Sequence, residues 1–287
     1  DWHSLTTHPH PGDVTANVRK ILSEYLACGI DPEKAAIYVQ SDVKEVLELY
    51  LYLNMNAYLG ELQRVTSFKE KARKQPENVN AGLLTYPTLM AADILIHRAD
   101  KVPVGKDQEQ NMEMARKFAR RFNTIYGVEF FPEPQSYSFG GDAIKVPGLD
   151  GSGKMGKSEG NAIYLIDDAA TIRKKVMKAV TDSGPTQPNS EKPEAIANLF
   201  TMLKIVSSAD SYDYFNEKYN ACEIRYGDLK KQLAEDIVNF TSPIRERILA
   251  YAADTEYMDK VAREGAEKAR ASADKTIREV RKIIGFN

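Results

Sequence analysis

Apolar residues recur at helical spacing along most of the chain, and two short runs depart from that spacing. The spacing predicts helices over 13–26, 46–53, 86–97 and 108–122. Ala35–Gln40 is a continuous apolar run, the pattern of a strand buried on both faces, and Lys101–Val104 is a shorter β-prone run. Helices and strands in this alternation favour a parallel sheet with helical crossovers.

The pattern changes after residue 170, where strand-like runs disappear. Helical spacing predicts further helices over 171–180, 194–207, 213–219, 224–252 and 256–284. Thr181–Pro193 is rich in proline, serine, threonine and asparagine, which is typical of a hinge between two bodies. The fold class that we expect is therefore α/β, with a parallel-sheet domain followed by an all-helical domain.

The segment Leu83–Gln110 combines a helix, a strand and a polar turn. Pro87 suits a position just inside a helix start, where its missing N–H costs nothing. Along one stripe of the predicted helix lie a phenol, a thioether, a carboxylate and an imidazole among apolar neighbours. They belong to Tyr86, Met90, Asp93 and His97. The strand that follows ends in the polar turn 105–108, which starts another helix. Ligands of open α/β sheets bind at the carboxyl ends of strands, beside helix N-termini, so we place the active site here.

Asp93 allows two interpretations. A carboxylate in an apolar helical stripe can accept a hydrogen bond from a single donor of a ligand. Alternatively, a neighbouring backbone group or lysine satisfies it as part of the protein's interior. The residues alone leave both interpretations open.

A second candidate site is the glycine-rich loop Ile144–Ser158, which reads IKVPGLDGSGKMGKS. Its four glycines allow the backbone to approach a ligand closely. Lys154 and Lys157 lie three residues apart in it, and two ammonium groups on such a loop suit a polyphosphate. The spacing is not that of a Walker A loop. An ordinary surface turn is the alternative, since glycine and lysine are both common in turns.

Composition narrows the choice of partners and compartment. The 287 residues carry a net charge of −2, so a nucleic-acid partner would need a local basic face. Two distant cysteines argue for a reducing compartment, and no stretch has the length of a membrane span, so we expect a cytoplasmic protein. His3, His8 and His10 lie close together, but nothing completes the spacing of a metal site, and we expect none. The charged segment Glu61–Glu77 is a solvated face, or a contact for phosphate or another subunit.

Taken together, several blocks of sequence resemble the bacterial-type tryptophanyl-tRNA synthetases, a family of class I aminoacyl-tRNA synthetases. The blocks follow the family order and read DWHSLTT, YLACGIDPEKAAIYVQSDV, AGLLTYPTLMAADILIHRADKVPVGKDQ, KMGKS and ADKTIREVRKIIGF. The resemblance implies a Rossmann-like catalytic domain over 1–170 and a helical anticodon-binding domain over 171–269. It also implies that a C-terminal helix, 270–287, packs back on the catalytic domain.

The resemblance implies a tryptophan pocket around the central helix. Asp93 would accept a hydrogen bond from the indole N–H, and Met90 would pack on the indole. Tyr86 and Gln108 would hold the ammonium and carboxylate groups of the substrate. The remaining pocket residues would be His3, Val102 and Val104.

The resemblance also implies an ATP site. Gly105, Lys106 and Asp107 would contact the ribose, and Val146 would contact the adenine. The glycine-rich loop would cover the triphosphate with Lys154, Met155, Gly156, Lys157 and Ser158. Lys154 and Lys157 would act in catalysis by stabilising the leaving pyrophosphate alongside the Mg²⁺ that accompanies ATP. No tightly bound cofactor is implied.

The implied activity is that of a tryptophan–tRNA ligase. Its partners would be tryptophan, ATP and tRNA(Trp), and it would be a homodimer with an interface near the helices of Val43–Lys74. A tyrosyl-tRNA synthetase, which has the same architecture, is the competing enzyme. A non-catalytic remnant that binds tryptophan or RNA is the alternative of another class.

Two departures from the family affect the expected ATP site. The family has serine at the position of Gly156, so we expect weaker loop closure but retained phosphate binding. The family also has a strand and a HIGH-like motif ahead of the position of Asp1. If the protein begins at Asp1, we expect poor pyrophosphate exchange and an exposed sheet edge.

Overall fold

The computed structural model describes residues 1–137, 145–156 and 159–286, apart from the side chain of Lys106. The chain packs as two compact units. The first comprises Asp1–Leu22, Ile30–Gly141 and Asp254–Asn287, and the second comprises Ser23–Gly29 and Asp142–Ala253. These packing units begin and end at other residues than the expected domains 1–170, 171–269 and 270–287. The expected division into a Rossmann-like catalytic domain, a helical anticodon-binding domain and a C-terminal helix stays a prediction.

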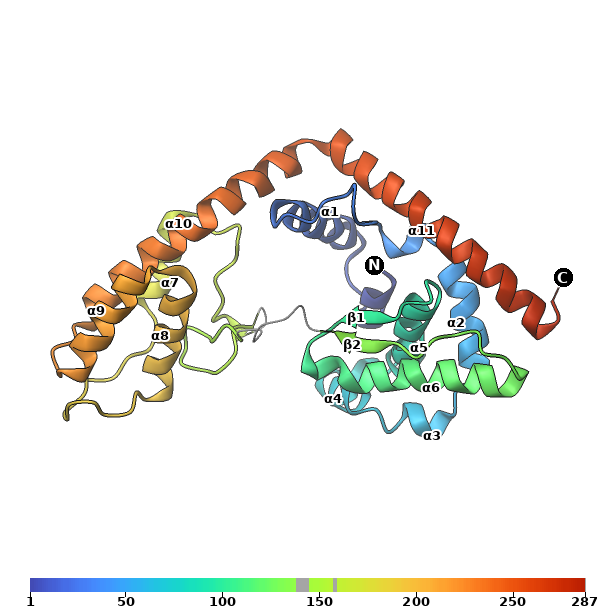
Figure 1. Ribbon diagram of the computed structural model, residues 1–287, viewed down its shortest axis with the longest axis horizontal. Coiled ribbons are helices and arrows are strands. Elements are labelled where there is room, and N and C mark those ends of the chain that lie inside the picture. The colour runs from blue at the N-terminus through green and yellow to red at the C-terminus, as the bar shows by residue number, and fades with distance from the viewer. Residues whose placement is uncertain (138–144, 157–158, 287) are drawn as a thin grey trace. The chain divides into compact units, whose positions relative to one another are not determined.

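The first unit is built around α5 (Ala81–Leu95), which packs against both α2 (Glu45–Met55) and α6 (Glu109–Tyr126) (Figure 1). The sequence of α5 is apolar on nearly all sides, so its neighbours bury it on more than one face. The other helical elements of this unit are η1 (Trp2–Thr7), α1 (Pro11–Ala27, which continues into the second unit), η2 (Gln40–Asp42), α3 (Leu59–Leu62), α4 (Thr66–Lys74), η3 (Pro76–Asn78), η4 (Lys106–Gln108) and α11 (Thr255–Ile284).

Pro87 lies inside α5 and not just after its start, which corrects the prediction. The helix begins earlier because Asn80 caps it: its side-chain oxygen accepts a hydrogen bond of 3.0 Å from the Leu83 N–H. Pro87 is buried and cannot donate to the preceding turn, and the tertiary packing of α5 tolerates this loss.

The two described strands form a parallel pair, which confirms the expected parallel pairing. Strand β1 (Lys101–Pro103) lies beside β2 (Gln135–Tyr137), with Val102 opposite Ser136 (Figure 1). Strand β1 leads through η4 into α6, so the expected order of helix, strand, polar turn and helix is present. The carboxyl end of β1 therefore points to the start of α6.

The apolar run 35–40 was expected to form a buried strand, and that prediction is wrong. Ala35 lies in a bend, residues 36–39 have no ladder partner among the described residues, and Gln40 begins η2. Their backbone instead crosses α11 at Gly265. A Cβ atom on Gly265 would lie 1.9 Å from the Ile37 carbonyl oxygen, so only glycine allows this approach.

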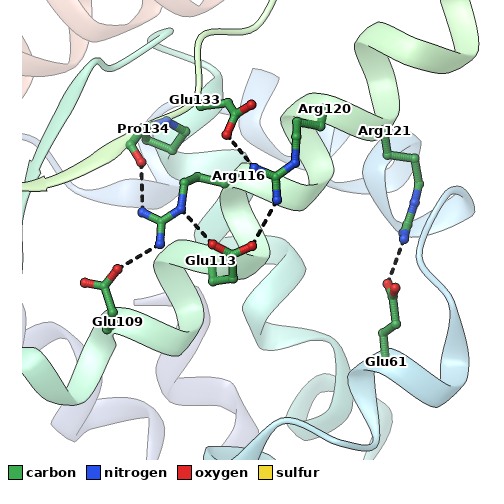
Figure 2. Close-up of polar contacts among 8 residues, drawn as sticks. All are labelled: Glu61, Glu109, Glu113, Arg116, Arg120, Arg121, Glu133 and Pro134. Carbon is green, nitrogen blue, oxygen red and sulfur yellow. Dashed lines mark hydrogen bonds and ion pairs between the residues drawn. The ribbon is translucent and has the colours of Figure 1, made fainter.

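Helix α6 is tied to its surroundings by a set of ion pairs (Figure 2). Arg116 pairs with Glu109 at 2.8 Å and Glu113 at 2.9 Å, and it donates to the Pro134 carbonyl oxygen at 3.2 Å. Arg120 pairs with Glu113 and with Glu133, which lies just before β2. Since these residues precede β2 directly, the contacts help to fix the strand beside β1.

The second unit, described over 23–29, 145–156 and 159–253, combines helices with long connecting loops. It contains α7 (Ala169–Met177), α8 (Glu194–Val206), α9 (Ala209–Asn220) and α10 (Tyr226–Ala253) (Figure 1). Their apolar faces enclose a core that includes Leu149 from the glycine-rich loop. Thus the loop belongs to the packing of the helical unit. Within the described residues, none of the helices combines the length and apolar character needed to cross a membrane.

Candidate active site

The carboxylate of Asp93 is held by two side chains from distant parts of the first unit. The Gln40 amide nitrogen donates to both oxygens, each at 2.9 Å, and the His3 Nε2 atom lies 2.9 Å from Oδ2. The side-chain carbonyl oxygen of Gln40 in turn accepts from the Trp2 main-chain N–H at 3.1 Å. The Asp93 side chain keeps 31% of its surface exposed. It is thus an oriented acceptor that a ligand can still reach.

Tyr86 lies one helical level before Met90 on α5 and is almost fully buried. Its ring meets the His3 ring edge-on, with 6.4 Å between centroids, and its hydroxyl bonds the Ser67 hydroxyl. The Lys71 ammonium lies 3.9 Å from the Tyr86 ring centroid, and burial lowers the pKa of this lysine. A cavity with a volume of 160 Å³ opens here, and His3 and Tyr86 both line it.

His97 continues the same stripe toward α11. Its Nε2 atom lies 2.9 Å from the Tyr38 hydroxyl, and its Nδ1 atom lies 3.2 Å from the Ser272 hydroxyl. Burial lowers the pKa of His97, and the nearby charge of Asp93 opposes this effect. A neutral imidazole that accepts from Tyr38 and donates to Ser272 fits that direction. His97 therefore connects the end of α5 to the C-terminal helix.

The carboxyl end of β1 presents a compact polar turn. The Gln108 side-chain amide donates to Asp107 at 3.0 Å, and its carbonyl oxygen accepts from Asn111 at 2.9 Å. A Cβ atom on Gly105 would lie 2.6 Å from the Asp107 carboxylate, so glycine makes room for this arrangement. This turn lies directly before α6, and main-chain N–H groups at a helix start attract anions.

The glycine-rich loop provides the candidate residues of the second unit. Its Met155 N–H donates to the Val146 carbonyl oxygen at 2.9 Å, which folds the loop back on itself. Lys154 is exposed. Val146, Lys154 and Met155 line a cavity with a volume of 500 Å³. Its other walls are Lys145, Thr241 and apolar residues of α8, α10 and the segment 162–165.

The structure therefore brings together part of the predicted tryptophan pocket. His3 and Asp93 are in contact, Tyr86 adjoins His3, and Met90 packs against the same buried core as Val102 and Val104. Gln108 contacts its neighbours in the β1 turn. In the second unit, Val146 is joined to Met155. Lys157, Ser158 and the side chain of Lys106 lie outside the described residues.

Two residues of this site were missed by the sequence prediction. Gln40 ends the apolar run 35–40, and a polar residue at the end of such a run was the available signal. Lys71 was contained in the charged segment Glu61–Glu77, where its spacing does not distinguish it from its neighbours. Their contacts with Asp93 and Tyr86 depend on tertiary packing.

Comparisons with known proteins identify the family. The sequence profile of the family described as tRNA synthetases class I (W and Y) matches residues 1–242. The chain belongs to this family of class I tRNA synthetases. The resemblance inferred from the sequence blocks is thereby confirmed.

Relatives within the family are similar over the whole chain. The tryptophan–tRNA ligase of Porphyromonas gingivalis (strain ATCC BAA-308 / W83) is 78% identical over 286 residues, which cover 100% of this chain and 88% of that protein. The crystal structure of tryptophanyl-tRNA synthetase from Campylobacter jejuni, complexed with ADP and tryptophan, superposes with a TM-score of 0.87 at 32% identity. That match covers 99% of this chain and 88% of the other. The expected α/β class I fold with a helical part is confirmed.

The sister family shares the architecture. The crystal structure of tyrosyl-tRNA synthetase from Aeropyrum pernix matches with a TM-score of 0.63 at 20% identity, over 92% of this chain and 77% of that one. At this identity the likeness shows the fold alone. The choice between tryptophan and tyrosine therefore depends on closer relatives and on the site.

Proposed function

We propose that this chain acts as a tryptophan–tRNA ligase, which activates tryptophan with ATP and transfers the tryptophanyl group to tRNA(Trp). The observation that carries the proposal is the oriented carboxylate of Asp93, which Gln40 and His3 hold within an otherwise apolar helix. An indole ring has one polar N–H in an apolar body. Asp93 is already ordered by Gln40 and His3, so an analogue that lacks the donor loses one hydrogen bond to a charged group, which contributes about 1.5–3 kcal/mol.

In this proposal the first unit binds the amino acid. Asp93 accepts the indole N–H, and Met90 packs on the ring. Tyr86 and Gln108 hold the ammonium and carboxylate groups of the substrate. The walls of the pocket are His3, Val102 and Val104. The contacts of His3 with Asp93 and Tyr86 support this assignment, because they gather three of these residues in one place.

ATP enters as its Mg²⁺ complex. The residues proposed to contact its ribose are Gly105, Lys106 and Asp107, and the one proposed to contact adenine is Val146. The loop residues proposed for the triphosphate are Lys154, Met155, Gly156, Lys157 and Ser158. The ADP and tryptophan bound in the Campylobacter jejuni structure support a nucleotide site in this family.

The proposed reaction has two steps. A carboxylate oxygen of tryptophan attacks the α-phosphorus of ATP, a P–O bond forms, and the bond to the leaving pyrophosphate breaks. Lys154 and Lys157 stabilise the negative charge that builds up on the pyrophosphate. In the second step, a hydroxyl at the 3′ end of tRNA attacks the acyl carbon, loses its proton and displaces AMP. Most of the catalytic effect comes from positioning the two substrates, because no protein side chain forms a covalent bond in the phosphoryl transfer.

ATP–pyrophosphate exchange tests the proposal. The protein is assayed with tryptophan and, separately, with tyrosine, and tryptophan binding is measured by calorimetry. We expect exchange with tryptophan and at most a trace with tyrosine. Exchange that prefers tyrosine would make the chain a tyrosyl-tRNA synthetase. Tryptophan binding without any exchange would support a non-catalytic remnant.

We also propose that the ligase is a homodimer that acts in the cytoplasm. Large apolar side chains are exposed along α2 and α3, at Leu47, Leu51, Met55, Tyr58 and Leu59. Such a cluster is typical of a protein interface. Met55 is the most open, with 77% of its surface exposed, so Met55→Glu should shift the dimer toward monomer in sedimentation velocity. Met177→Glu, which alters an exposed methionine of α7, is the control. A wild-type protein that sediments as a monomer would exclude the dimer.

Helical residues of the second unit are proposed to read the anticodon of tRNA(Trp). The cytoplasmic site of action suits the two exposed thiols, Cys28 and Cys222, which form no disulfide.

A further inference from the structure

One buried amide holds the described part of the glycine-rich loop. Asn161 has 4% of its surface exposed. Its Nδ2 atom donates to the Asp150 carboxylate at 2.9 Å, to the Ser152 hydroxyl at 3.0 Å and to the Lys154 carbonyl oxygen at 3.1 Å. Its Oδ1 atom accepts from the Gly156 N–H at 2.9 Å. One side chain therefore binds the main chain on both sides of Met155.

The loop is shaped around this amide. A Cβ atom on Gly148 would lie 2.2 Å from the Asn161 Nδ2 atom, 2.5 Å from the Asp150 Oδ1 atom and 2.7 Å from the Ser152 hydroxyl. These distances are too short for any side chain, so Gly148 is the residue that leaves space for the cluster. The main-chain carbonyl oxygen of Asn161 also accepts from the Leu149 N–H at 3.1 Å, which joins the start of the loop to the segment that follows it.

The other attachments of the loop lie elsewhere. Asn198 of α8 donates to the carbonyl oxygens of Gly151 and Ser152, at 3.0 and 3.1 Å. These bonds fix the first half of the loop to the helical unit. Among the described residues, Asn161 binds the main chain of both Lys154 and Gly156. The Ser152 hydroxyl also donates to the Lys154 carbonyl oxygen at 3.2 Å, and the Met155 N–H donates to the Val146 carbonyl oxygen at 2.9 Å. Asn161 is thus the side chain that ties together the two residues on either side of Met155, and it helps to set the direction in which the Lys154 side chain leaves the loop.

We infer that Asn161 is a positioning residue of the ligase reaction, which fixes the backbone of the glycine-rich loop so that the Lys154 ammonium meets the triphosphate. This inference rests on the proposed function and adds to it a residue that contacts no substrate. An amide is suited to the task because it donates on one side and accepts on the other. An aspartate would have no donor for the Lys154 carbonyl oxygen and would repel Asp150.

The test uses two variants that disturb the same cluster from opposite sides. Asn161→Ala removes the amide, and Gly148→Ala forces a methyl group against it. Asn216→Ala is the matched control, because it removes a part-buried amide of the same unit that binds Lys192. Thermal unfolding and tryptophan affinity are measured first, to show that each variant is folded and binds the amino acid.

Two readouts follow. The first is the rate of tryptic cleavage after Lys154 under native conditions, which reports local opening of the loop independently of activity. We expect it to rise about tenfold or more in Asn161→Ala and Gly148→Ala, as the loss of one to two net hydrogen bonds allows. The second is tryptophan-dependent ATP–pyrophosphate exchange. Its kcat should fall by about ten- to a hundredfold at unchanged tryptophan affinity, because a small misplacement of a positioned group is costly.

The outcomes separate the two proposals. Unchanged cleavage in both folded variants would overturn the inference, and so would raised cleavage with unchanged exchange. Raised cleavage with a lower kcat, and with Asn216→Ala behaving as wild type, would support it. If the wild-type protein itself shows no tryptophan-dependent exchange, the proposed function fails, and with it the catalytic part of the inference. The cleavage rates would still decide whether Asn161 anchors the loop.

Discussion

Replacing Asp93 with alanine should remove the recognition of the indole N–H. In the structure the carboxylate is fixed by Gln40 and His3, so it can accept a substrate donor without first being ordered. Asp93→Ala removes both oxygens and leaves the Gln40 amide and the His3 ring without their partner. The Met90 contact and the apolar pocket wall remain. The loss should therefore concern the N–H and not the binding of the ring as a whole.

The magnitude follows from the kind of bond that is lost. A hydrogen bond to a charged group contributes about 1.5–3 kcal/mol. With about 1.4 kcal/mol for each tenfold change, this predicts that kcat/KM for tryptophan falls by roughly 10- to 150-fold. The lower end applies if water replaces the carboxylate, since 31% of the Asp93 side chain is exposed. The rate with saturating tryptophan should change less than KM, because the indole lies away from the reacting carboxylate.

The assay compares tryptophan with an isostere in which sulfur replaces the indole N–H. Wild-type protein should prefer tryptophan strongly, and Asp93→Ala should use the two amino acids about equally. This double comparison isolates the N–H, because both amino acids fill the same volume. Asp13→Ala, which removes an exposed carboxylate of α1, controls for the loss of a charge.

An unchanged KM for tryptophan in Asp93→Ala would refute the assignment. The same conclusion would follow if Asp93→Ala kept the wild-type preference against the sulfur analogue. A crystal of the complex in which the indole nitrogen bonds another residue would refute it directly.

Two further predictions concern Lys154 of the glycine-rich loop and the stability of the fold. Lys154→Ala should lower the rate of tryptophan activation by about 10²–10³-fold while tryptophan affinity stays within twofold, because the proposed role of the ammonium is to stabilise charge that appears only in the transition state. Single-turnover kinetics, with Lys178→Ala as the control variant, would measure both quantities. Equal losses in rate and affinity would argue against that role. Gly265→Ala should destabilise the protein by about 1–3 kcal/mol or more in urea unfolding, because a Cβ atom would lie 1.9, 2.6 and 2.9 Å from the backbone O, C and N atoms of Ile37. Gly60→Ala, where nothing lies within 4 Å, should be neutral or slightly stabilising, and equal stability of the two variants would contradict the reasoning.

The elements around the central site could be predicted because their signals are local. Helix α6 shows a clear apolar face, and β1 is a short β-prone run that ends in a polar turn. The prediction that Pro87 lies just inside the start of the helix was wrong, because the preference of proline for helix starts is a weak signal. The cap at Asn80 and the burial of α5 outweighed it. Local propensity gives way where tertiary packing supplies more free energy.

The run 35–40 shows a second kind of failure. Its apolar character predicted a strand buried on both faces, but its residues are only partly buried and Ala36 is exposed, and apolar character does not specify a ladder partner. The partner is the surface of α11, more than two hundred residues further along the chain, and the meeting point is a glycine that permits backbone contact. A single glycine in a long amphipathic helix carries no sign of what it touches.

The residues that orient the site share this dependence on distant partners. Gln40 ends the mispredicted run and bonds Asp93, three residues after Ile37, whose backbone lies against Gly265. Asn161 comes after the glycine-rich loop in the chain and binds back to the main chain of Lys154 and Gly156. Both are side-chain amides, which lack charge and periodicity and so leave little trace in a sequence. The groups proposed to touch substrate could be recognised by their chemistry, whereas the groups that hold them in place are identified only by their contacts. We expect Gln40→Ala to weaken tryptophan binding, because it removes the amide that orients Asp93. If Gly265→Ala remained folded and weakened tryptophan binding to the same extent, a chain of contacts from α11 to Asp93 would be established. If Gly265→Ala lost stability alone, the orientation of Asp93 would have to come from Gln40 and His3 without the Gly265 contact.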